Sequence, residues 1–69
     1  MNLTNDEYIE FRKQLKETLK EFPSLRKGQI MFNVLYEIKP ELADKIRSSN
    51  IDPFYNDNNI PEFMKYINE

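Results

Sequence analysis

Four prolines divide this chain into short segments, and within these segments apolar residues recur at helical spacing. The prolines are Pro23, Pro40, Pro53 and Pro61, and the chain has a single glycine. Proline breaks the hydrogen-bonding of a helix interior and disfavours the helical conformation of the residue before it. No segment of useful length shows the apolar–polar alternation of a half-buried strand. The sequence therefore predicts an all-α fold of short helices joined by tight breaks.

The first segment carries the clearest helical pattern. Thr4 followed by Glu7 is a capping-box signature at a helix start. Pro23 ends the helix near its preceding residue. The apolar residues spaced by three and four are Tyr8, Phe11, Leu15, Leu19 and Phe22. This spacing predicts an amphipathic helix that turns these five side chains inward.

The second segment is apolar on most sides as far as Ile38, which predicts the central helix of the fold. Ser24 is a plausible N-cap, and a start nearer Lys27 is the alternative, because Gly28 blurs the boundary. Gly28 has two interpretations. It either lets a neighbouring helix approach closely, or it is a glycine tolerated near a helix end.

Two short helices are predicted after the central one. Pro40 suits the first position of a third helix. Asn59 and Pro61 suit the cap and first turn of a fourth. Residues 48–59 are rich in Asn, Asp and Ser, which is typical of turns, and predict an ordered loop. The 69 residues are thus expected to form one compact bundle of about four helices, the last two short.

The composition disfavours catalysis and metal binding. The chain contains no histidine and no cysteine, so the commonest general base and the strongest nucleophile are both missing. Asp52 and Asp57 could act as a carboxylate pair, but a turn cap and a solvated acid are the simpler interpretations. A calcium loop starting at Asp52 fails at three positions, those of Phe54, Asp57 and Phe63. We expect no enzymatic activity and no cofactor.

The sequence also predicts a soluble cytoplasmic protein without a membrane partner. No apolar stretch approaches the roughly 20 residues that cross a bilayer. The first residues lack the basic and apolar regions of a signal peptide. The absence of cysteine fits a reducing compartment.

Nucleic acid is a disfavoured partner. The formal net charge is −2, whereas nucleic-acid-binding domains usually carry a basic excess. One weak basic patch is predicted, at Lys20, Arg26 and Lys27. In a helix-turn-helix interpretation the third helix would approach DNA with Glu41 and Asp44 at its front, where acidic groups repel phosphates.

Six residues around the predicted loop form the candidate site. They are Gln29, Asn33, Arg47, Asp52, Phe54 and Tyr55. In one interpretation they clasp the loop: Asn33 or Gln29 hydrogen-bonds it, Arg47 pairs with Asp52, and Phe54 plugs a gap between helices. In the other, they form a recognition surface for a protein, because tyrosine supplies contact area with little loss of entropy.

The same region resembles a group of small proteins of bacteria, phages and prophages. The shared pattern comprises Gly28-Gln29, Phe32-Asn33, Leu35-Tyr36, Pro40 to Ala43, Ile46-Arg47 and Asp52 to Tyr55. The resemblance covers roughly the C-terminal two-thirds of the chain. Members of the group often have Gly-Thr where this chain has Ser48-Ser49, directly after the third helix. The resemblance implies a stand-alone small domain of mobile-element origin and implies no catalytic activity.

These observations favour a non-enzymatic module that binds another protein. Two alternatives remain at this stage. One is a nucleic-acid-associated regulator that uses the basic patch. The other is a self-assembling structural protein, in which the apolar stripe of the first helix and the tyrosines are buried between copies.

Overall fold

The computed structural model describes residues 2–68, and within them the chain forms helices and no strand. The elements are α1 (Asn5–Glu21), α2 (Lys27–Ile38), α3 (Pro40–Ile46), the 3-10 turn η1 (Asp57–Asn59) and α4 (Ile60–Asn68). This confirms the all-α prediction of four helices with the last two short.

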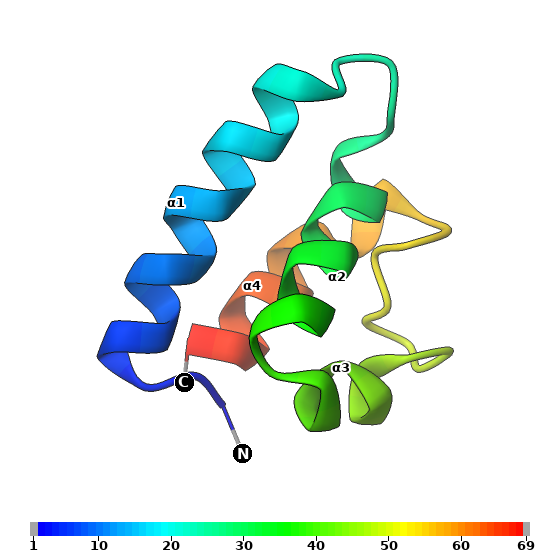
Figure 1. The fold of residues 1–69 in the computed structure, drawn as a ribbon. Helices are drawn as coiled ribbons and strands as arrows, with labels where there is room; N and C mark the ends of the chain where they lie inside the picture. Colours follow the sequence, from blue (N-terminus) through cyan, green and yellow to red (C-terminus); the bar gives the residue numbers. More distant parts are fainter. Residues whose placement is uncertain (1, 69) are drawn as a thin grey trace.

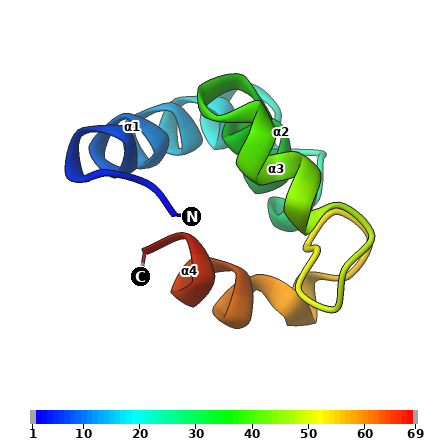
Figure 2. The ribbon, with the colours of Figure 1, turned by 90° about the horizontal axis from the view of Figure 1, so that it is seen from below.

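The other three helices are arranged about α2 (Figure 1). α1 and α2 lie antiparallel, and α3 turns across the end of α2. The chain then runs back along α2 in a loop, and α4 returns toward the N-terminus. Figure 2 shows the two termini on the same side of the molecule. There the backbone N–H of Leu3 donates to the carbonyl of Ile67 at 3.0 Å, which ties the two ends of the described chain together.

The core is built around α2, as its sequence predicts. Five of its apolar side chains are buried: Ile30, Met31, Phe32, Val34 and Leu35. They meet buried side chains from every other helix, namely Phe11, Leu42, Ala43, Ile46, Phe63 and Ile67. A short helix that is apolar on several faces is stable only when neighbours cover those faces. The packing of α1, α3 and α4 therefore stabilises α2.

The first helix begins as predicted and ends one residue earlier than its apolar pattern. The Thr4 hydroxyl accepts from the Glu7 backbone N–H, and the Glu7 carboxylate accepts from that of Thr4, which completes the capping box. Phe22, predicted to be inward, is 49% exposed. It is the C-cap residue, with φ −126° and ψ 64°, so its side chain no longer follows the helical stripe.

Two predicted helix caps are replaced by other arrangements. α2 begins at Lys27, the alternative start, and its cap residue is Arg26 and not Ser24. Before α4, the turn η1 is capped by the side chain of Asn56, which accepts from the Asn58 backbone N–H at 3.0 Å. The Asn59 side chain points instead to the preceding loop, where it donates to the Asp52 carbonyl.

Candidate functional site

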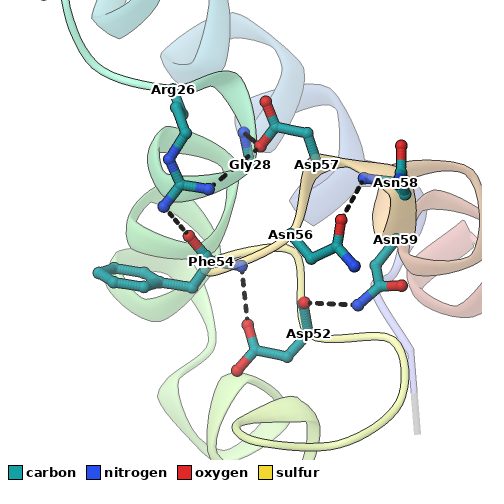
Figure 3. Close-up of polar contacts among 8 residues, drawn as sticks. All are labelled: Arg26, Gly28, Asp52, Phe54, Asn56, Asp57, Asn58 and Asn59. Carbon is teal, nitrogen blue, oxygen red and sulfur yellow. Dashed lines mark hydrogen bonds and ion pairs between the residues drawn. The ribbon is translucent and has the colours of Figure 1, made fainter.

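The loop after α3 is fastened to the N-terminal end of α2 (Figure 3). The Arg26 guanidinium donates to the carbonyl of Phe54. The Asp57 carboxylate accepts from the Gly28 backbone N–H at 3.2 Å and lies 3.7 Å from the Arg26 guanidinium. α2 has no acidic residue in its first turn and no side-chain cap of its own. Asp57 therefore supplies, from 29 residues away, the anion that a helix N-terminus favours.

Gly28 allows this close approach because it has no side chain. A Cβ atom at this position would overlap the carbonyl oxygen of Pro53 and would lie 2.6 Å from an Asp57 carboxylate oxygen. The neighbour that uses the space is thus the loop, and not another helix.

Asp52 determines the conformation of the loop. Its carboxylate accepts from the backbone N–H of Ser48 at 2.7 Å and from that of Phe54 at 2.9 Å. Its own carbonyl accepts from the Asn59 side chain at 2.9 Å. Asp52 is only 5% exposed, and among residues 2–68 no buried side-chain nitrogen or oxygen lacks a hydrogen bond. The loop is therefore held by polar contacts that replace those to water.

A groove of about 680 Å³ opens between α2 and this loop. We call it the aromatic groove. It is lined by Phe32, Asn33, Tyr36, Glu37, Arg47, Ser48, Asp52, Phe54 and Tyr55. The four members from α2 are spaced by one, three and four residues, so that they share one face of the helix. The other five come from the end of α3 and the loop.

Three of the four aromatic side chains of the groove pack edge to face. The ring of Phe54 lies 5.8 Å from that of Phe32 at 85°, and 4.8 Å from that of Tyr55 at 64°. Phe54, predicted to plug a gap between helices, is half-buried and packs on the core and against Phe32 of α2. Tyr55 is 77% exposed and Tyr36 is 43% exposed. The groove thus presents two accessible phenols above a packed aromatic floor.

Arg47 lies over two aromatic rings of the groove and not against Asp52. Its guanidinium carbon is 5.8 Å from the ring centroid of Phe32 and 5.4 Å from that of Tyr36. Its ion pair is with Asp44, at 3.4 Å. The predicted pair between Arg47 and Asp52 is wrong: Arg47 pairs with Asp44, and the Asp52 carboxylate accepts from the backbone N–H groups of Ser48 and Phe54.

The structure brings five of the six candidate residues to one place. Asn33, Arg47, Asp52, Phe54 and Tyr55 all line the aromatic groove. Gln29 is half-buried and lies outside the lining residues. Among the described residues, neither Gln29 nor Asn33 makes the predicted hydrogen bond to the loop. The loop is instead held by contacts of Arg26, Asp57 and Asn59.

Sequence reasoning missed Tyr36 and Glu37 as members of the site. Both are one turn beyond Phe32 and Asn33 on the same helix face, and that spacing was available in the sequence. In the predicted basic patch, Lys20 and Lys27 carry no such contact to the loop, whereas Arg26 is engaged by it. Of the three predicted cations, Arg26 is therefore the one that the loop engages.

The groove offers recognition chemistry. Its donors are a guanidinium, two phenols, an amide and a hydroxyl, and its apolar part is aromatic. No group of three or more acidic side chains that could hold a metal ion occurs in residues 2–68. Within the same residues, no helix has the length and apolar character needed to cross a bilayer. No family model, curated protein or solved structure matches the chain.

Proposed function

We propose that this chain is a non-enzymatic, protein-binding accessory module of the cytoplasm, of phage or prophage origin, and that the aromatic groove receives a segment of another protein. The observation that carries the proposal is the placement of Tyr36, Tyr55 and Arg47 around one groove. Tyrosine and arginine are among the residue types enriched at the energetic centres of protein interfaces.

The rigidity of the loop supports the same proposal. Tyr55 follows Phe54, whose N–H and carbonyl are both hydrogen-bonded, to Asp52 and Arg26. A side chain on a fixed backbone binds a partner without the additional entropy cost of ordering that backbone. The loop therefore presents Tyr55 as a preorganised contact.

The two alternatives have less support from the contacts. In the apolar stripe of α1, Tyr8, Leu15 and Leu19 pack on the chain's own core, which leaves less of the stripe for a second copy. For nucleic acid, Arg26 is engaged by the loop, and Glu37 and Asp44 lie at or near the groove.

Affinity capture with matched variants tests the proposal. The wild-type chain, a Tyr36→Ala/Tyr55→Ala double variant and a Tyr66→Ala control are used to capture proteins from extracts of the source cells. Tyr66 is 38% exposed on α4 and lies outside the aromatic groove. We expect a protein, identified by mass spectrometry, that the wild type and the control retain and the double variant loses.

The captured protein is then purified and titrated against each variant. Loss of two interface tyrosines is expected to weaken the affinity by at least about tenfold. NMR chemical-shift changes of the wild type should map to the groove. Equal binding by the double variant, or failure of the purified protein to bind, would contradict the proposal.

A further inference from the structure

We infer that the aromatic groove recognises an internal segment of the partner in which an Asp or Glu stands beside a large apolar side chain, with the carboxylate held by Arg47. This inference rests on the proposed function and deepens it by naming the chemistry of the segment.

Arg47 has free capacity to bind an anion. Its side chain is 53% exposed, and its pair with Asp44 joins two exposed groups at 3.4 Å, with Asp44 60% exposed. Such surface pairs contribute little and exchange readily. A guanidinium has five N–H donors in a planar fork, which matches the two oxygens of a carboxylate.

Two aromatic rings lie beside this fork. The guanidinium lies within 6 Å of two ring centroids, those of Phe32 at 5.8 Å and Tyr36 at 5.4 Å. Stacking on aromatic rings restricts the guanidinium and leaves its edge for hydrogen bonds. These ring contacts thus favour positions of Arg47 over the groove, where a carboxylate can reach it.

The charge of the groove favours a carboxylate over a phosphoryl group. Arg47 is the one cationic side chain among the residues that line the groove, and two acids, Glu37 and Asp52, also line it. Phosphoryl groups carry nearly two negative charges and are recognised by clusters of arginines. A single arginine beside an acid suits a single negative charge.

The backbone favours a side-chain carboxylate over a terminal one. Capture of a chain terminus uses converging backbone N–H groups. At the groove, the N–H groups of Ser48 and Phe54 are already donated to Asp52. The carboxylate of the partner is therefore bound by a side chain, and the segment runs through the open groove.

The same groove accounts for the apolar neighbour of the carboxylate. Tyr36 and Tyr55 expose their rings next to the half-buried Phe54. A large aliphatic or aromatic side chain that covers these rings removes apolar surface from water at the site of the charge contact. Removing water also strengthens the hydrogen bonds to Arg47.

A randomised peptide display selection tests the inference. The probe is a library of 12-residue peptides whose C-termini are fused to the carrier, so that no terminal carboxylate is free. A second arm uses the same library with free C-termini. We expect the fused library to enrich Asp or Glu within two positions of an aromatic or large aliphatic residue, and Arg47→Gln to lose this enrichment.

The best selected peptide, synthesised with blocked ends, is then titrated by NMR. Replacing its acidic residue by the amide, or Arg47 by Gln, should each weaken binding about tenfold, and the two changes together should weaken it no further. Arg12→Gln is the matched control, because Arg12 also lies over a ring, that of Tyr8 at 5.9 Å, on α1. It should bind as the wild type does.

Several results would overturn the inference: no enrichment, enrichment without acidic residues, acidic enrichment only in the free-terminus arm, or equal binding by Arg47→Gln. The proposed function is judged separately. If binding of a purified partner depends on Tyr36 and Tyr55 but not on Arg47, the proposed function stands and the proposed carboxylate contact is refuted.

Discussion

Gly28 and Ser48 show how single backbone positions set the shape of the loop. At Gly28 the loop occupies the volume that a side chain would need, since a Cβ would overlap the Pro53 carbonyl. At Ser48 the backbone has φ 61°, in the left-handed region that disfavours residues with a Cβ. Gly28 lies in the first turn of α2 and Ser48 directly follows the end of α3, so small substitutions there test the backbone on both sides of the loop contact.

Gly28→Ala is expected to lower the free energy of unfolding. The added methyl group has no room unless the loop moves, and overpacking of this kind costs about 1–3 kcal/mol. Alanine's higher helix propensity returns less than about 1 kcal/mol. Urea denaturation measures the difference, with exposed Lys27→Ala as the control. A Gly28→Ala variant as stable as the wild type would show that the loop does not approach α2 so closely.

Substitutions of Ser48 are expected to follow the preference for positive φ. Ser48→Gly relieves the steric penalty of the left-handed region, roughly 1–2 kcal/mol, but loses part of this gain to the greater freedom of the unfolded chain. Ser48→Val raises the penalty, because a β-branched side chain fits this region poorly. Thermal unfolding should place the glycine variant level with or above the wild type, and the valine variant below it. A valine variant as stable as the wild type would contradict the described turn.

At the scale of elements, the helices differ in where their start signals lie. The start of α1 was predictable because Thr4 and Glu7 form its cap within one turn. The start of α2 was left open between Ser24 and Lys27, because its capping carboxylate, Asp57, belongs to a residue far along the chain. The candidate site followed the same division. Its members were predicted as a set from their types, whereas the predicted pairing of Arg47 with Asp52 was wrong. Arg47 pairs with Asp44, three residues earlier, and the Asp52 carboxylate accepts from backbone N–H groups instead.

The capping box of α1 predicts a pH-dependent stability. The hydrogen bond from the Thr4 backbone, followed by that from Lys39, holds the pKa of Glu7 below its usual 4.5. A carboxylate with a lowered pKa in the folded state stabilises the fold above its unfolded pKa, and this contribution is lost as the pH falls through the folded value. Glu7→Gln should therefore be less stable than the wild type at pH 7, and the gap should narrow by pH 3 in urea titrations.

Thr4→Ala separates this charge effect from the loss of a cap. It removes the hydroxyl that accepts from Glu7 but keeps the backbone N–H that donates to the carboxylate. Its stability should fall by about 1 kcal/mol at both pH values, with the pH dependence retained. A constant gap between wild type and Glu7→Gln across this range would refute the assigned cause.

For the molecule as a whole, the loop is the connection that joins three helices. It leaves α3, is fastened to α2 at Arg26 and Gly28, and leads through η1 into α4. A chain of this size has roughly 3–10 kcal/mol of stability in total. A hydrogen-bonding side chain in this loop therefore affects a large fraction of the folding free energy. Its loss is expected to destabilise every helix.

Asp52→Ala tests whether the loop and the helices unfold as one unit. The change leaves the N–H groups of Ser48 and Phe54 without their acceptor, at about 1–3 kcal/mol each where water cannot replace it. Asp52→Asn, which keeps one acceptor oxygen, should fall between alanine and wild type. Asp44→Ala is the control, because it removes an exposed ion pair worth less than about 1 kcal/mol. If the fold is one cooperative unit, circular dichroism at 222 nm and amide exchange at Gly28 should report the same loss of stability. Fast amide exchange confined to residues 48–56, with unchanged unfolding of the helices, would contradict this expectation. It would mean that the loop that lines the groove does not contribute to the stability of the helix bundle.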